Sequence, residues 1–114
     1  MKNIIYALQG LLFALRTEWN MRFHLAAAVL VIYAGIWLHI SSVEWLVLCI
    51  CIGLIISFEL MNSAIEQLCN MITQQIHPAI KNIKDISAAA VLVASVVSAV
   101  AGLFIFLPKL LLLF

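Results

Sequence analysis

The chain has 114 residues, of which 67% are hydrophobic and only 10% are charged. A soluble domain of this length could not bury so much apolar surface, whereas a bilayer accepts it and needs about 20 apolar residues for each helical crossing. The composition therefore predicts two to three membrane crossings in one domain over residues 1–114. A net charge of +1 excludes a broad basic surface for nucleic acid.

Residues 4–20 predict an amphipathic helix. Apolar side chains recur there at helical spacing, while Gln9, Arg16 and Asn20 lie largely off the apolar stripe. We expect such a helix to lie on the membrane surface rather than to cross it.

Three further segments predict membrane-spanning helices. The first span covers residues 24–40, and the second covers residues 44–72, with its last turns outside the hydrocarbon. A polar connection at residues 74–85 leads to the third span, residues 86–107, which we expect to end before Pro108.

The third span also carries small residues at every fourth position, a spacing that suits close packing within one subunit or between subunits. These residues are Ala90, Ala94, Ser98 and Gly102.

The basic residues predict the orientation of the chain. Five of the six Lys and Arg residues fall on one side of a three-span arrangement, and only Lys109 falls on the other. By the positive-inside rule, the side with five is cytoplasmic. The surface helix and the 74–85 connection then both face the cytoplasm.

Polar side chains interrupt the apolar sequence near the end of the second span. Those that share one sector of about 100° on a helix are Glu59, Asn62, Ser63 and Glu66. A central acidic residue costs about 2.5–3.5 kcal/mol on insertion scales, so acids at this depth indicate a functional site. Two alternatives are hydrogen-bonded helix packing and a solvated helix end, and the second fits Glu66 better than Glu59.

Two other charged groups share this side of the membrane. Glu18 is followed by Arg22 at i+4, for which a simple ion pair is the alternative. Lys84 and Asp85 lie in the polar connection, where a solvated loop is the alternative. Carboxylates can hold Mg²⁺, a lysine can neutralise phosphate, and a buried carboxylate can take a proton from an alcohol. This inventory predicts phosphoryl transfer, although no known glycine-rich nucleotide loop occurs.

The Glu-x-x-Asn-Ser-Ala-x-Glu run from Glu59 to Glu66 closely resembles a motif of the prokaryotic diacylglycerol kinase family, as does the downstream Lys84-Asp85. The Gram-positive branch of that family includes undecaprenol kinases. The Glu18-x-x-x-Arg22-Phe23-His24 segment resembles the family's N-terminal motif. The resemblance extends from about Tyr6 to the third span.

The resemblance implies an all-α homotrimer of three-span subunits in the inner membrane of a prokaryote, with composite active sites between subunits. It implies phosphorylation of a membrane lipid alcohol by ATP, with Glu59 as the general base, Asn62 in support, and Mg²⁺ held by Glu18 and Glu66. The residues that it assigns to ATP and its metal are Tyr6, Glu18, Glu66, Gln75, His77, Lys84 and Asp85. Those that it assigns to the lipid are Glu59, Ala88 and Trp45.

Several positions depart from the family pattern. Asn70 stands where an aspartate is expected, Gln75 where a glutamate is common, and Ala88 where the diacylglycerol kinases carry a serine. These departures bear on nucleotide affinity and lipid contacts. His24 stands where the diacylglycerol branch tends to carry glutamate, and His77-Pro78 resembles the undecaprenol branch. We therefore favour undecaprenol over diacylglycerol as the substrate.

The alternative from another class is a non-enzymatic membrane assembly, such as a holin-like pore or a small structural subunit. The polar stripe would then face water in the pore. This alternative leaves the grouping of Glu18 with Lys84 and Asp85 on one side unexplained.

Overall fold

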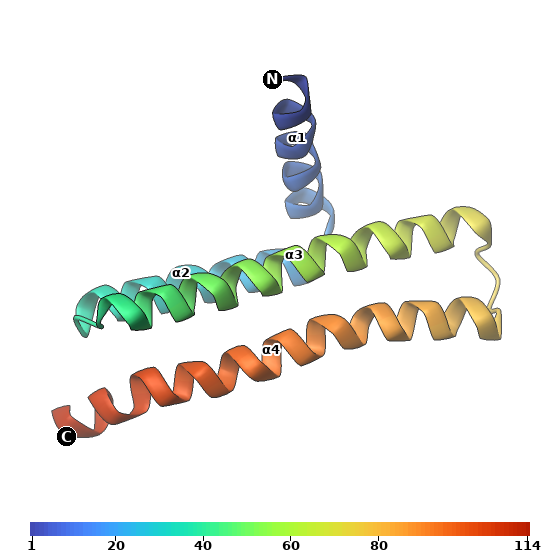
Figure 1. The fold of residues 1–114 in the computed structure, drawn as a ribbon. Coiled ribbons are helices and arrows are strands. Elements are labelled where there is room, and N and C mark those ends of the chain that lie inside the picture. Colours follow the sequence, from blue (N-terminus) through green and yellow to red (C-terminus); the bar gives the residue numbers. More distant parts are fainter.

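The computed structural model describes residues 1–114 and consists of four helices without any strand (Figure 1). Their bounds are Lys2–Thr17 for α1, Trp19–Trp37 for α2, Ser42–Ile72 for α3 and Pro78–Leu113 for α4. Helices α2, α3 and α4 are each long and apolar enough to cross a membrane. The all-α class with three spanning helices and one separate N-terminal helix is therefore confirmed.

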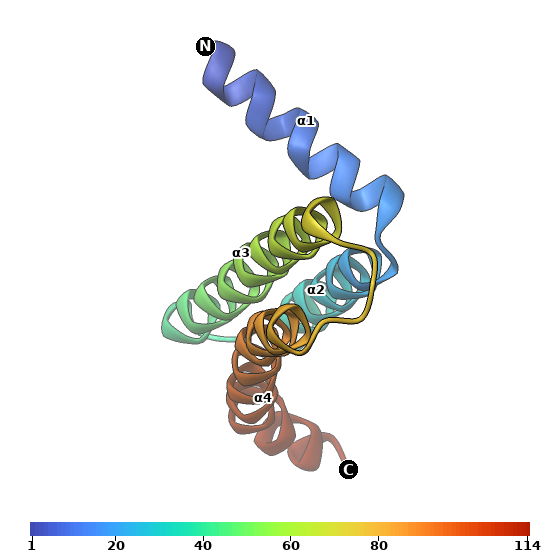
Figure 2. The same ribbon diagram turned by 90° about the vertical axis from the view of Figure 1, so that its right-hand side faces the viewer.

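Helices α2, α3 and α4 lie side by side. Helix α1 stands at a steep angle to them, and its N-terminus points away from the bundle (Figures 1 and 2). Helix α4 packs mainly against α3. Helix α1 makes few contacts, and its C-terminal end is the part that lies at the bundle (Figure 1). The 31 residues of α3 extend about 46 Å, which is longer than the hydrocarbon core of about 30 Å. One or both ends of α3 must therefore project beyond the hydrocarbon.

The chain breaks at Glu18, so the predicted 4–20 helix and 24–40 span have the wrong boundary. Glu18 is extended, with φ −123° and ψ 122°, and α2 begins at the next residue. The Arg22 side chain donates to the carbonyl of Leu15 at 2.7 Å and also to that of Arg16. These bonds satisfy carbonyls that the end of α1 leaves free. Arg22 therefore caps α1 and does not form the i,i+4 pair with Glu18.

Helix α4 begins earlier than its predicted span. The connection covers only residues 73–77, because Pro78 suits the first helical position and His77 Nδ1 accepts from the Ala79 N–H at 3.2 Å. The predicted polar connection at residues 74–85 is thus wrong over most of its length. Lys84 and Asp85 lie on the first turns of a helix and not in a loop.

Helix α4 also continues through Pro108 to Leu113, so the predicted end at residue 107 is wrong. Proline removes one backbone donor, but neighbouring groups make this tolerable in membrane helices. Lys109, one residue further on, is held by Glu44 of α3 at 3.0 Å, which fixes this part of α4 against its neighbour.

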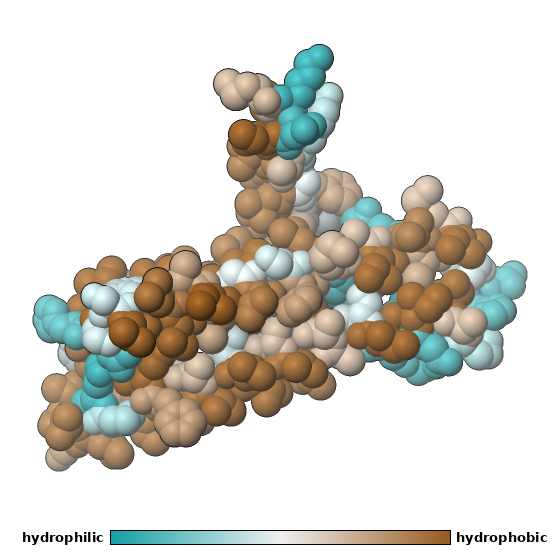
Figure 3. Space-filling model, viewed as in Figure 1, coloured by the Kyte–Doolittle hydropathy of each residue, from teal (hydrophilic) through white to brown (hydrophobic).

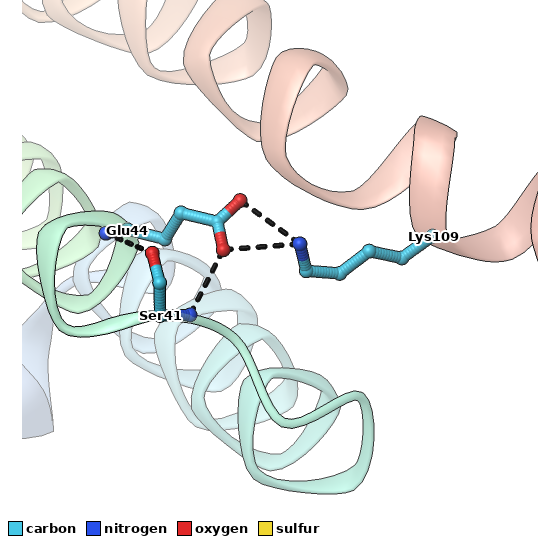
Figure 4. Close-up of polar contacts among 3 residues, drawn as sticks. All are labelled: Ser41, Glu44 and Lys109. Atoms are coloured by element: carbon cyan, nitrogen blue, oxygen red, sulfur yellow. Dashed lines mark hydrogen bonds and ion pairs between the residues drawn. The ribbon is translucent and has the colours of Figure 1, made fainter.

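The α2–α3 turn and α4 are joined by a polar cluster that we call the Glu44 clasp: Ser41, Glu44 and Lys109 (Figure 4). Ser41 Oγ accepts from the Glu44 N–H at 3.2 Å, and Glu44 Oε1 accepts from the Ser41 N–H at 2.9 Å. This reciprocal capping box starts α3. Because Lys109 Nζ binds the same carboxylate, the clasp connects both helices at one end of the bundle.

Large apolar side chains cover most of the bundle surface, and hydrophilic residues gather towards its ends (Figure 3). Only 13 of the 114 residues are buried, and a compact apolar core of Ile40, Leu48 and Ile105 lies beside the clasp. Gly35 allows Trp45 to approach there, because a Cβ at Gly35 would lie 2.8 Å from the indole. Most apolar surface of the spanning helices therefore needs lipid or another subunit to cover it.

Candidate functional site

The middle of α3 carries polar side chains that face into the bundle. Glu59, Asn62 and Ser63 expose only 1%, 6% and 5% of their surface, although apolar residues surround them in the sequence. Glu66, one turn further on, is half-buried. The predicted polar stripe is thus turned towards protein and not towards lipid. Together with Glu18, these residues form what we call the Glu59 cluster.

Glu18 joins this cluster from the break between α1 and α2. Its Oε2 accepts a hydrogen bond from the Ser63 hydroxyl, which also lies 2.9 Å from the Glu59 carbonyl oxygen. The extended backbone of Glu18 lets its side chain point towards α3. Because Arg22 binds the carbonyls at the end of α1, it does not pair with the Glu18 carboxylate, which is left to accept from Ser63. A residue of the N-terminal region is thereby fixed beside the polar face of α3.

Three carboxylates belong to the Glu59 cluster. Glu18 and Glu66 both lie close enough to Glu59 to repel it electrostatically. Like charges gathered at a buried position raise the free energy of the fold unless a cation or a proton offsets them. The arrangement therefore favours binding of a positive charge.

Two buried oxygens of the cluster have no hydrogen-bond partner within the chain, Glu59 Oε1 and Asn62 Oδ1. An unsatisfied buried polar group costs about 1–3 kcal/mol, so such atoms indicate a missing ligand or a catalytic role. Both atoms are acceptors, and an alcohol O–H or a cation would satisfy them.

No group of three or more His, Cys, Asp or Glu side chains converges as a ready-made metal site. Mg²⁺ that arrives with a nucleotide usually takes one or two carboxylates and completes its shell with phosphates and water. The donor set of Glu18 and Glu66 fits that mode and does not fit an all-protein cage.

The positions assigned to the nucleotide lie partly beside the cluster. Lys84 Nζ donates to Asn70 Oδ1 at 2.6 Å, which joins α4 to α3 one turn beyond Glu66. Asp85 is exposed and pairs with Lys81 at 2.6 Å. Asn70, which stands where an aspartate was expected, thus accepts a hydrogen bond from the Lys84 ammonium group.

The remaining predicted residues are exposed or pack elsewhere in this chain. Tyr6 is 63% exposed on α1, and Gln75 and His77 lie in the connection before α4. Ala88 is exposed on α4. Trp45 lies about 21 Å from Glu59 along α3 and packs in the apolar core beside the clasp.

A groove lies between the three spanning helices and includes His24, the residue that faces Glu59; the Glu59 cluster itself does not line it. Its volume is about 380 Å³, and 11 of its 15 lining residues are hydrophobic. It extends from Phe23 and His24 of α2 along Ser98 and Gly102 of α4 to Phe106. Of the predicted small-residue stripe, Ala94 is buried and these two residues line the groove, whereas Ala90 is exposed.

His24 is a residue of this site that the sequence did not assign. Its Nε2 lies 3.8 Å from Glu59 Oε2, and its side chain also lines the groove. The sequence placed it only in the Glu18-x-x-x-Arg22-Phe23-His24 segment and at a position where the branches of the family differ. Nothing in the spacing indicated which residue of α3 it would face.

Comparisons with known proteins agree with this arrangement. Residues 5–106 match the family described as prokaryotic diacylglycerol kinase. The undecaprenol kinase of Bacillus subtilis is 43% identical over 109 residues, which cover 96% of this chain and 89% of the relative.

Two relatives named diacylglycerol kinase also match. That of Synechocystis sp. is 35% identical over 107 residues, which cover 93% of this chain and 61% of the relative. That of Escherichia coli is 30% identical over 95 residues, with coverages of 83% and 78%.

Proposed function

Because this chain belongs to the prokaryotic diacylglycerol kinase family and is a lipid kinase, we propose that it phosphorylates undecaprenol with ATP. The preference for undecaprenol is supported by the 43% identity to the Bacillus subtilis enzyme of that name, against 30–35% for the two diacylglycerol kinases. Diacylglycerol is the second candidate. Membership of a kinase family leaves no support for the non-enzymatic pore or structural subunit.

The observation that carries this proposal is the buried Glu59 carboxylate, which has one unpartnered oxygen and lies beside His24, a lining residue of the apolar groove. A membrane alcohol needs an apolar path for its chain and a base for its hydroxyl. Glu59 accepts the hydroxyl proton, and the alcohol oxygen forms a bond to the γ-phosphorus of ATP. The bond from that phosphorus to the β-phosphate oxygen breaks, and ADP leaves. Asn62 Oδ1 lies on the same face and supports the reacting hydroxyl.

Glu18 and Glu66 would hold the Mg²⁺ that accompanies ATP. The bound ion would supply positive charge to the phosphates, and such charge stabilisation is a main requirement of phosphoryl transfer. Glu18 is oriented by the Ser63 hydroxyl, and Glu66 projects from the same helix towards the end of α3. Thus α3 presents its base deeper in the membrane and its metal ligand nearer the water.

Lys84 and Asp85 contact the nucleotide beside this metal, together with Gln75 and His77 of the connection. These residues lie at or between the ends of α3 and α4, one turn or more beyond Glu66, which suits a nucleotide that arrives from the aqueous side.

Tyr6 contacts the nucleotide, and Ala88 and Trp45 contact the lipid, in a homotrimer with composite sites. Two observations support the trimer. The apolar faces of α2, α3 and α4 are largely uncovered in one chain, and Tyr6 and Trp45 do not reach the Glu59 cluster of their own subunit.

The active site faces the cytoplasm from the inner membrane of a prokaryote. Five of the six basic residues lie on α1, on the first turn of α2 and on the first turns of α4, whereas Lys109 is held in the clasp near the other end of α4. By the positive-inside rule, the side with five basic residues is cytoplasmic.

The test is transfer of radiolabel from [γ-³²P]ATP to a panel of lipid alcohols in mixed micelles, with undecaprenol and diacylglycerol at equal mole fractions. We expect the higher kcat/KM with undecaprenol. A higher kcat/KM with diacylglycerol would replace undecaprenol by the second candidate without changing the assignment as a lipid kinase.

A further inference from the structure

His24 provides the only polar side-chain contact of the Glu59 carboxylate. Its Nε2 lies 3.8 Å from Oε2, and the two side chains expose 15% and 2% of their surface. The other oxygen, Oε1, is buried without a partner. The two oxygens of the proposed base are therefore unequal, since one faces an imidazole and the other is free.

The charged side chains and the Ser63 hydroxyl near Glu59 do not take the place of this contact. Glu18 and Glu66 are carboxylates that repel it and donate no hydrogen bond when ionised. The Ser63 hydroxyl is shared between Glu18 and a backbone carbonyl, and Arg22 is engaged in capping α1. His24 is thus the side chain able to donate that the structure places against Oε2 of the carboxylate.

The position of His24 on α2 also connects the base with the groove. The imidazole packs edge-on against Phe23, with ring centroids 5.7 Å apart, and both residues line the apolar groove at the level of the Glu59 cluster. An alcohol in the groove that approaches Glu59 passes beside His24.

We propose that His24 is a positioning residue for Glu59, holding Oε2 so that Oε1 points to the lipid hydroxyl. The inference rests on the proposed role of Glu59 as the base. At 3.8 Å the contact is longer than a hydrogen bond, and such contacts commonly shorten when substrate completes a site. A general base must lie within hydrogen-bond reach of the proton that it takes, so its orientation determines kcat.

Two polar substitutions of His24 whose side chains differ in length test this role. The terminal amide of His24→Gln can place a donor near the position of Nε2, whereas that of His24→Asn is too short. Tyr33→Leu is the matched control, because Tyr33 lies on the same helix and is 74% exposed. We measure kcat and the KM values for ATP and for the lipid that the parent protein uses best.

We expect His24→Asn to lower kcat about 10- to 100-fold, which is part of the 10²–10⁴-fold that a general base contributes. His24→Gln should recover kcat to within about fivefold of the parent, and Tyr33→Leu should match the parent. The KM for ATP should stay within about twofold throughout, since His24 lies on the lipid side of the cluster. Equal kcat for the asparagine and glutamine variants, or a change in the KM for ATP alone, would overturn the inference.

A double substitution separates this inference from the proposed base. In a Glu59→Gln background, adding His24→Asn should cause no further loss, because the two residues act through one carboxylate. If Glu59→Gln is inactive but His24→Asn keeps the parental kcat, only the role of His24 fails. If Glu59→Gln keeps the parental kcat, the proposed base fails and the role of His24 fails with it.

Discussion

Two polar clusters of the bundle differ in how many of their polar atoms are paired within the chain: the Glu44 clasp at one end, and the Glu59 cluster around the middle of α3. In the Glu44 clasp, the carboxylate binds Lys109 and the Ser41 N–H, and the Ser41 hydroxyl binds the Glu44 N–H (Figure 4). In the Glu59 cluster, none of the three carboxylates is bound to a lysine or an arginine, and two buried oxygens lack partners.

This difference separates a stabilising role from a functional one. A polar group that is paired within the chain contributes to stability and has no acceptor left for a ligand. A cluster that keeps free acceptors and excess negative charge lowers the stability of the empty protein but is ready for a cation and an alcohol. The comparison predicts that substitutions in the Glu59 cluster change activity and that substitutions in the clasp change stability.

The largest expected effect is that of Glu59→Gln. We expect kcat for lipid phosphorylation to fall about 10²- to 10⁴-fold, because the amide cannot accept the hydroxyl proton. The thermal unfolding temperature should stay equal or rise, since one of three like charges is removed. The matched control is Glu44→Gln, which changes the same side-chain type on the same helix and should keep the parental kcat. Equal activity loss in both variants would contradict the comparison.

The second prediction concerns the metal. Glu66→Gln should raise the Mg²⁺ concentration needed for half-maximal rate about tenfold or more, because one anionic ligand is lost. Titration of the rate with MgCl₂ at saturating ATP measures the change. Gln67→Ala is the control, since Gln67 is the exposed neighbour of Glu66. An unchanged Mg²⁺ requirement in Glu66→Gln would remove this residue from the metal site.

A smaller effect is expected at the nucleotide. Lys84→Gln should raise the KM for ATP about three- to tenfold, since one positive charge near the phosphates is lost while Asn70 keeps a donor. Lys81→Gln provides the control, because Lys81 lies one turn earlier on α4 and is 67% exposed in its pair with Asp85. Equal effects of the two substitutions would indicate general electrostatic attraction of ATP and not a specific contact.

The sequence predicted the parts of the structure that follow from local composition. Long apolar runs determined the three spanning helices, and acids inside such a run identified the polar face of α3. The break at Glu18 was missed because neither Gly nor Pro marks it. Its cause is the tertiary contact of Ser63 and the capping by Arg22.

The contact of His24 with Glu59 was missed for a related reason. Helical periodicity gives the face of each helix but not its level against a neighbour, so no spacing within α2 or α3 predicts which residues meet. The path of α4 through Pro108 was missed as well, because the tolerance of a membrane helix for proline depends on what surrounds it.

The smallest expected effect is at the clasp. Lys109→Met should lower the stability of the fold only slightly, because the pair with Glu44 is partly exposed and surface ion pairs contribute little. Unfolding followed by circular dichroism in detergent should therefore shift by only a few degrees, and kcat should stay at the parental value. A large loss of kcat in this variant would mean that the Glu44 clasp and the Glu59 cluster are coupled. The contrast between a stabilising cluster and a functional cluster would then fail, even with Glu59 as the base.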